Sequence, residues 1–341
     1  MSLDQVLARG ESCALTVVAG FPVGSQRLML AIDAIDRQIN RPSASAILEI
    51  TLDKKLSIER IHERDASAID YVFEDGWHGL LLRDGIEQVT SDGVTFTSIP
   101  VGEKGSTRRL ARSGGVVYAC GTAADEVDGF IGCLDAKHAW KHLTAMSDGY
   151  ERGTFEAMHF PTPAEGYAVG SWGALFRGNA KGFTAVPLPD LAFSVDGNPR
   201  HRHSLRGVHV RADGTVLLAG RDFAGVYADG AVTNLGGDKR YVDACAEYRG
   251  VEYWALENGM AERLEIATRT DNTLTTVFAG GKQKRHRPQY ARGRITVRDD
   301  LMIVTHLDRI HIFDGKAWTS LKLQPEPSQL VKRIPVGMKP V

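Results

Sequence analysis

The sequence predicts an all-β fold made of repeated four-stranded units, and three observations carry this prediction. First, the dipeptide Asp-Gly occurs nine times, and both of its residues tolerate the positive φ of a two-residue hairpin turn. Second, short runs of Val, Ile, Leu, Tyr and Thr lie between these turns, and helical spacing of apolar residues is nearly absent outside Ser2 to Leu7. Third, a pattern of four strands recurs along the chain with a period of roughly 40 residues.

Residues 204–236 provide the clearest copy of this pattern and serve as its template. The template predicts seven units, spanning residues 12–63, 68–100, 106–146, 154–189, 204–236, 241–280 and 292–324. Such a period is typical of β-propeller blades, because one blade cannot bury both faces of its sheet and a ring of blades can. We therefore expect one domain over residues 1–341, a seven-bladed β-propeller of four-stranded antiparallel blades, with a β-sandwich or solenoid as the alternative.

The two ends of the chain lie outside these units. Residues 325–341 are expected to form a proline-punctuated tail. Either this tail or residues 1–10 is expected to dock on a blade and latch the ring. The residues from 1 to 12 contain an early acid and no apolar core, so they do not resemble a secretory signal.

Composition narrows the classes of partner. The net charge is −1 and the pI is about 6.8, which disfavours bulk attraction to nucleic acid or to an anionic membrane. No apolar run reaches the length of a membrane span. The cysteines show no CxxC spacing and three lie in apolar strand-like runs, so we expect buried thiols in a reducing, cytoplasmic compartment. The five tryptophans are expected to pack between blades.

Two turns carry a resemblance to known propellers. The segment Ser91-Asp92-Gly93-Val94-Thr95-Phe96 and the segment Asp314-Gly315-Lys316-Ala317-Trp318 resemble the Asp–Gly turn that leads to an aromatic in sialidase-type repeats and in photosystem II assembly factor-like propellers. The turn here is one residue shorter. Those families include hydrolases and non-enzymatic assembly factors, so the resemblance implies the fold and leaves the activity open. The segment Arg333-Ile334-Pro335 has the residues of a sialidase motif. It lies in the C-terminal tail, so we interpret the match as a coincidence.

Basic residues cluster where the first strand of several units begins. Propeller topology places these positions around the mouth of the central channel, together with the long loops 189–204 and 279–292. Arg-Gly opens three units, at Arg152, Arg206 and Arg292. Arginine suits carboxylate or phosphate, so we expect an anionic ligand or partner. The candidate binding residues are Arg109, Arg152, Arg200, His201, Arg202, His203, Arg206, Arg240, Arg285, His286, Arg287 and Arg292.

Simpler interpretations stand beside this one. The arginines could be solvated, or could pair with Asp125, Glu126 and Asp128 on a loop of the third unit. The spacing His201-x-His203 can chelate a metal, but the flanking arginines would repel a cation, so we expect no metal and no cofactor. Aromatics do not interleave with the arginines, which disfavours nucleic acid.

The function that the sequence favours is a protein-interaction module. It would act as a scaffold, an assembly factor or an inhibitor or immunity-type protein that binds an acidic partner through the basic channel mouth. The alternative is a lyase or hydrolase that acts on a small anionic substrate there. No nucleophile motif supports the enzyme, because Ser171-Trp172-Gly173 lacks the Gly-x-Ser-x-Gly pattern.

Overall fold

The described part of the chain is nearly all β-strand. The computed structural model describes residues 2–36, 41–82, 85–89, 96–99, 106–123, 128–134, 139–145, 153–188, 194–195, 198–202, 204–237, 240–258, 263–280, 293–298, 300–326 and 329–336. These residues form six antiparallel sheets of four strands, one sheet of five strands and one two-stranded hairpin. Within each large sheet the strands follow in chain order. This is the β-propeller arrangement that the repeat predicts, with the count of four-stranded sheets corrected from seven to six.

The chain divides into two compact units, which are described separately. The first unit comprises Met1–Ile99 and Lys284–Gly337, and the second comprises Pro100–Gln283 and Met338–Val341. In the first unit, helix α1 (Leu3–Leu7) and the 3-10 turn η1 (Gly10–Ser12) precede three sheets. These are β1 (Cys13–Val23), β2 (Arg27–Asp36), β3 (Arg41–Thr51) and β4 (Ser57–Arg64); β5 (Ala68–Glu74), β6 (Trp77–Leu82), β7 (Gly85–Val89) and β8 (Phe96–Ile99); and β27 (Arg294–Arg298), β28 (Leu301–His306), β29 (Arg309–Phe313), β30 (Trp318–Leu323) and β31 (Val331–Ile334).

The second unit contains four large sheets and the hairpin. Its first two sheets are β9 (Ser106–Ser113), β10 (Val116–Thr122), β11 (Gly129–Leu134) and β12 (Trp140–Ala145); and β13 (Phe155–Thr162), β14 (Glu165–Gly170), β15 (Leu175–Asn179) and β16 (Gly182–Ala185), with the 3-10 turn η2 (Ser171–Gly173) between β14 and β15. The hairpin is β17 (Ser194–Val195) and β18 (Asn198–Arg202). The last two sheets are β19 (Leu205–Val210), β20 (Val216–Gly220), β21 (Phe223–Ala228) and β22 (Ala231–Gly236); and β23 (Tyr241–Tyr248), β24 (Val251–Asn258), β25 (Arg263–Thr270) and β26 (Thr273–Ala279).

Local chemistry explains the short turns and the one helix. Asp75 and Gly76, and Asp229 and Gly230, all have positive φ, as the two-residue hairpin requires. The expected helical turn forms as α1, and Ser2 caps it with a reciprocal capping box to Gln5.

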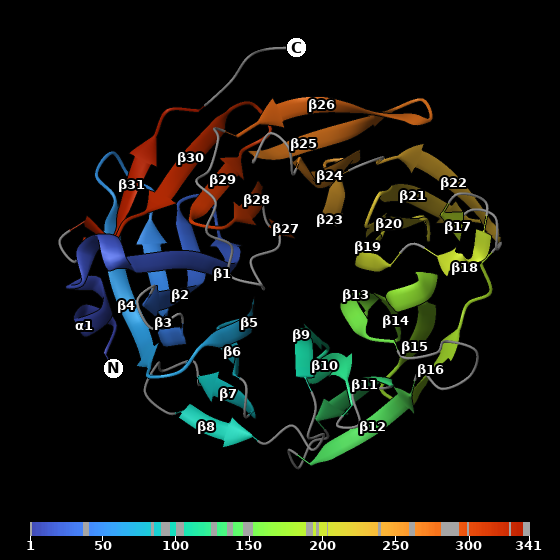
Figure 1. Cartoon of the computed structure of the whole chain (residues 1–341), viewed down its shortest axis with the longest axis horizontal. Coiled ribbons are helices and arrows are strands. Elements are labelled where there is room, and N and C mark those ends of the chain that lie inside the picture. Colours follow the sequence, from blue (N-terminus) through green and yellow to red (C-terminus); the bar gives the residue numbers. More distant parts are fainter. Residues whose placement is uncertain are drawn as a thin grey trace. The chain divides into compact units, whose positions relative to one another are not determined.

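In the second unit, the first strands of successive sheets lie against one another. Strand β13 contacts β9 and β19, and β19 contacts β23 (Figure 1). Apolar clusters fill the spaces between successive sheets, for example Val169 and Leu175 against Leu205 and Val208. All four cysteines are buried and none is in a disulfide, as expected.

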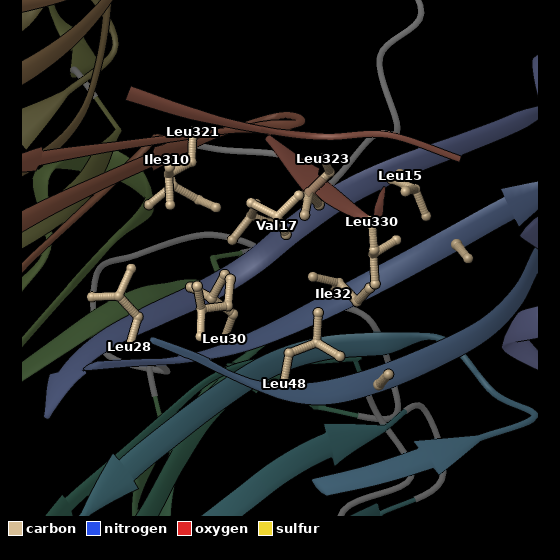
Figure 2. Packing of buried hydrophobic residues seen from close by; sticks show 14 of the residues in the cluster. Leu15, Val17, Leu28, Leu30, Ile32, Leu48, Ile310, Leu321, Leu323 and Leu330 are labelled. Carbon is tan, nitrogen blue, oxygen red and sulfur yellow. The ribbon is translucent and has the colours of Figure 1, made fainter. Parts of the chain in front are cut away.

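The core of the first unit joins the two ends of the chain. Alternate residues of β2, Leu28, Leu30 and Ile32, place their side chains on one face of the sheet. Figure 2 shows them packed with side chains of β29 and β30 and with Leu330. Leu3, Val6 and Leu7 of α1 belong to the same cluster. Both ends therefore contribute to one core.

The tail residues 331–334 do more than dock, because they add a strand. Strand β31 pairs antiparallel with β30, which makes this the five-stranded sheet and extends the last predicted repeat beyond residue 324. Arg333 donates from Nη2 to the carbonyl oxygens of Leu52 and Asp53, at 2.8 and 2.5 Å. Arg333 thus ties the tail strand to the connection between β3 and β4.

We expect Leu330→Ala to lower the free energy of unfolding by about 2–4 kcal/mol, because the lost side chain leaves a cavity between β2 and β30. Denaturant unfolding of the full chain measures this. Gln329→Ala is the matched control, since Gln329 is exposed and adjacent. An equal loss of unfolding free energy in both variants would show that burial of Leu330 does not stabilise this core.

Candidate functional site

A backbone irregularity repeats at the start of each first strand in the second unit. A one-residue β-bulge places an extra residue in β9, β13, β19 and β23. A bulge bends the strand and re-aims the side chain that it carries. The bulged residues are Arg108, Glu156, Arg206 and Asp243. Basic and acidic residues therefore alternate from sheet to sheet at equivalent positions.

Arg206 and Asp243 show what this alternation does. The Arg206 Nη1 lies 3.2 Å from the Asp243 Oδ1, and the carboxylate is only 3% exposed. The next residue, Gly207, makes the approach possible, because a Cβ there would lie 3.0 Å from the Ala244 Cα and from the Asp243 carbonyl oxygen. The Arg-Gly dipeptide that the sequence singles out thus lets β19 pack closely on β23.

The other described candidate arginines are also bound inside the unit. The Arg109 Nε donates to the Glu156 carbonyl oxygen at 3.1 Å. The Arg240 Nη1 lies 3.5 Å from Glu265, and Arg263 binds the same carboxylate at 2.8 Å. The carboxylate partners are therefore strand residues of the neighbouring or same sheet. Of the acids that the sequence proposes as partners, Asp125 and Glu126 lie outside the described residues.

The remaining candidates are only partly placed. Arg200, His201 and Arg202 lie on β18, and their side chains are not described. The segment 189–204, expected to be irregular, contains the hairpin β17–β18, and β18 lies against η2. Outside the described residues lie Arg152, His203, Arg285, His286, Arg287 and Arg292.

In the first unit, charged residues that the sequence analysis did not select join β27 to β5. Arg294 forms an ion pair with Asp70, whose side chain is 1% exposed. Arg298 pairs with Asp75 at 3.1 Å and lies over the Phe73 ring. Ion pairs between two sheets can be predicted only when the register between those sheets is known. The sequence alone therefore did not indicate these pairs.

Trp172 corrects the expectation that all five tryptophans pack between blades. It is 40% exposed, one of three large apolar residues in the described chain with such exposure. Its φ of 59° and ψ of 27° lie in the left-handed region, which is unfavourable for a bulky residue. Thr154 and Ser171 hold the loop, since the Ser171 N–H donates to the Thr154 carbonyl at 2.9 Å and the Thr154 N–H donates to the Ser171 Oγ at 3.1 Å.

The equivalent loop of the next sheet carries an exposed arginine. Arg221 has 63% of its side chain exposed, and its guanidinium carbon lies 5.6 Å from the centre of the Tyr241 ring. Arg206 lies over the same ring at 4.7 Å. The backbone is fixed by a bridge between Arg221 and Tyr241 and by a bond of 3.0 Å from the Asp222 N–H to the Arg240 carbonyl oxygen. We call Trp172, Arg206, Arg221, Tyr241 and strand β18 the loop edge of the second unit.

Two histidines lie side by side between the first strands β13 and β19. The rings of His159 and His209 are 4.4 Å apart, and the His159 Nδ1 accepts a hydrogen bond from the Val210 N–H at 3.0 Å. Burial lowers the pKa of His159 to about 3 and that of His209 to about 4. Arg211 adds to the lowering at His209, whereas Glu247 opposes it. Both rings are thus neutral at pH 7.

No described group of three or more His, Cys, Asp or Glu residues has the arrangement of a metal site. In the described residues, no helix has the length and apolarity needed to cross a membrane.

Comparisons with known proteins show similarity in fold. No protein-family model and no curated protein matches the chain. Among solved structures, the chain is similar to a catalytically inactive virginiamycin B lyase from Staphylococcus aureus, with 11% identity, a TM-score of 0.60 and coverage of 87% of this chain and 94% of that one.

Two WD40 domains are also similar. For the WD40 β-propeller domain of Doa1 the identity is 11%, the TM-score 0.57 and the coverage 89% of this chain and 97% of that one. For the WD40 domain of Pan2 from Neurospora crassa the values are 8%, 0.53, 89% and 88%. At these identities the similarity shows the β-propeller fold alone.

We expect acid to weaken the contact between the sheets of β13 and β19. The folded pKa values of His159 and His209 lie below the unfolded value near 6.5, so this stability is complete above pH 6.5 and is lost as the pH falls toward 4. The slope is up to about 1.4 kcal/mol per pH unit for each histidine. Chemical denaturation between pH 7 and 4 measures it.

A comparison of variants separates the effect of the two histidines on acid sensitivity from that of other titrating groups. Asp33 in the first unit acts with the opposite sign, since burial raises the pKa of its carboxyl to about 7 and protonation stabilises the fold as the pH falls. We expect His209→Phe to reduce the acid sensitivity, and His142→Gln, at an exposed position, to leave it unchanged. Identical pH profiles for all three proteins would contradict the prediction.

We expect Gly170→Ala to destabilise the loop that carries Trp172, by about 1–3 kcal/mol. A Cβ at Gly170 would lie 2.1 Å from the Thr154 carbonyl oxygen, which accepts the bond from Ser171. Gly182→Ala is the control, because the nearest atom there is 3.7 Å away. Thermal unfolding, with limited proteolysis of the loop, measures the difference.

Proposed function

We propose that the protein is a protein-interaction module and that the loop edge of the second unit is its binding surface. The observation that carries this proposal is Trp172, a large apolar side chain that is exposed and held in the left-handed region. A bulky residue in that conformation costs roughly 1–2 kcal/mol, and such strain concentrates at functional sites. The folded protein therefore keeps an unfavourable backbone conformation at Trp172, and this conformation exposes the indole ring to solvent.

The chemistry of the loop edge is that of an interface centre. Trp, Tyr and Arg are the residues that most often carry binding energy between proteins. Trp172 and Arg221 supply two of these from the connections between strands, and Tyr241 supplies the third as the first residue of strand β23. The backbone bonds that hold these loops reduce the entropy lost on binding.

The charges of the loop edge favour an acidic partner less strongly than the basic channel mouth expected from the sequence would. The described arginines Arg206 and Arg240 already face carboxylates, so they add little net positive field. Strand β18, which contains Arg200, His201 and Arg202, lies against η2. We propose that aromatic burial provides the affinity and that basic residues orient the acidic partner.

The enzyme alternative has no specific observation among the described residues in its favour, so we propose the binding function alone. The cytoplasmic location, the lack of a cofactor and binding of a small anionic ligand stay predictions of the sequence.

We expect Trp172→Gly to abolish partner binding while the free energy of unfolding changes by less than about 1 kcal/mol, because relief of the left-handed strain offsets lost contacts. A photo-cross-linking residue at position 222, beside Arg221, first identifies the partner. Purified partner is then titrated against the wild type, Trp172→Gly and Arg221→Ala.

The matched control is Val277→Ala, since Val277 is exposed to 44% on the outer strand β26. Equal affinity of the Trp172→Gly variant and the wild type would overturn the proposal.

A further inference from the structure

We propose that the tail strand β31 and the turn between β3 and β4 form a binding site for a phosphorylated serine or threonine of a protein partner. The site consists of Lys54, Lys55 and Arg333, which we call the basic patch. It lies in the first unit and uses none of the loop-edge residues, so it goes beyond the proposed function. Its basis is that the described chain supplies no carboxylate to any of these three cations.

Arg333 brings the two segments of the basic patch together. Strand β31 lies at the edge of its sheet, paired with β30 (Figure 1). From there the Arg333 Nη2 donates to the carbonyl oxygens of Leu52 and Asp53, at 2.8 and 2.5 Å. The Asp53 carbonyl is joined directly to the Lys54 nitrogen, and Lys55 follows. These two bonds therefore hold the lysine-bearing turn against the guanidinium.

The side chain of Arg333 is fixed without a charged partner. Other described arginines, such as Arg206 and Arg294, face buried carboxylates. Arg333 is exposed, and the described partners of its side chain are the two neutral carbonyl groups alone. A guanidinium has five N–H donors, and both of these bonds start from Nη2. The Nε and Nη1 donors thus remain for an anion that comes from outside the described chain.

The two lysines add positive charge beside this guanidinium. Lys54 and Lys55 are both exposed, and neither forms an ion pair with a described carboxylate. The turn over residues 52–56 contains one acid, Asp53. Three cations are therefore accompanied by a single carboxylate. The local charge is positive although the whole chain has a net charge of −1.

This balance of charge favours a dianion. Coulomb attraction grows in proportion to the charge of the ligand. A phosphate monoester carries close to two negative charges at pH 7 and presents three acceptor oxygens. A carboxylate and a phosphate diester carry one negative charge each. The basic patch therefore suits a monoester better than an acidic side chain or the backbone of a nucleic acid.

The exposure of the basic patch favours a phosphoryl group that belongs to a protein. Lys54, Lys55 and Arg333 are all exposed, so a small free ester bound to them would keep much of its surface in water. Small ligands bind tightly in concave sites that bury most of their surface. A phosphorylated side chain gains further contacts from the residues on either side of it. We therefore assign the patch to phosphoserine or phosphothreonine.

The test uses the full chain and a fluorescent peptide of about ten residues, blocked at both ends, with one phosphoserine among glycine and alanine. We expect the double variant Lys54→Gln/Lys55→Gln to weaken binding about tenfold, because two charges beside the dianion are lost. We expect Arg333→Gln to weaken it about five- to tenfold. The double variant keeps the bonds made by Arg333, so a loosened tail strand cannot explain its loss of affinity.

Lys332→Gln is the matched control. Lys332 is adjacent to Arg333 on the same strand, and successive side chains of a strand point to opposite faces. The substitution removes one charge next to the basic patch but not within it, so we expect a loss of less than about twofold. Equal losses in Lys332→Gln and Arg333→Gln, or unchanged affinity of the double lysine variant, would overturn the proposal.

Three further probes identify the ligand chemistry. We expect no binding of the unphosphorylated peptide, and at least about fivefold weaker binding when glutamate replaces the phosphoserine. Inorganic phosphate should displace the phosphopeptide only at concentrations well above the dissociation constant of the peptide. A glutamate peptide that binds as tightly as the phosphopeptide would overturn the preference for a dianion. Inorganic phosphate that competes as well as the peptide would overturn the assignment to a protein segment.

The result is independent of the proposed function. Trp172→Gly leaves the basic patch unchanged, so this variant should bind the phosphopeptide as the wild type does. Loss of phosphopeptide binding in Trp172→Gly would overturn the placement of the site in the first unit. Partner binding at the loop edge that does not depend on Trp172 contradicts the proposed function and leaves the phosphopeptide result intact.

Discussion

The ion pair between Arg206 and Asp243 is the interaction on which the loop edge depends. A carboxylate that is 3% exposed must be matched by a cation, because an uncompensated buried charge is strongly destabilising. Arg206 supplies that cation from the neighbouring sheet, and Gly207 allows the two first strands to approach closely enough. The pair holds Arg206 over the Tyr241 ring, to which the backbone bridge brings Arg221. The geometry of the proposed binding surface therefore depends on a structural ion pair.

Local chemistry made much of the fold predictable. Asp-Gly at residues 75 and 229 adopts the positive φ values that the hairpin needs, and the cap at Ser2 forms as its sequence suggests. The position of a β-bulge is different, because it depends on how two neighbouring strands pair and not on the composition of either one. That is why Arg206 could be selected from the sequence as a basic residue, whereas its partner Asp243 could not.

The same limit applies to features formed by distant segments. The fifth strand, Val331–Ile334, adds to β30 because Leu330 and the helix α1 share one core with β2, and this joins both ends of the chain. His159 and His209 are 50 residues apart in the sequence, and their rings meet only because β13 packs on β19. Each histidine alone is indistinguishable in the sequence from any other strand residue. Trp172 likewise reads as a blade-packing aromatic until its backbone conformation is known.

The alternation of charge at the bulges changes how the protein can select a partner. A ring of unmatched arginines would attract many anionic surfaces and would be screened over about 8–10 Å at physiological salt. Arginines that are already matched by carboxylates attract weakly at long range, so discrimination has to arise at contact. There the exposed Trp172 side chain and the Tyr241 ring of the proposed surface impose requirements of shape that a diffuse field lacks. Under the proposed function, the net charge of −1 limits indiscriminate binding of nucleic acid or anionic membranes, and the contacts of the loop edge select the partner.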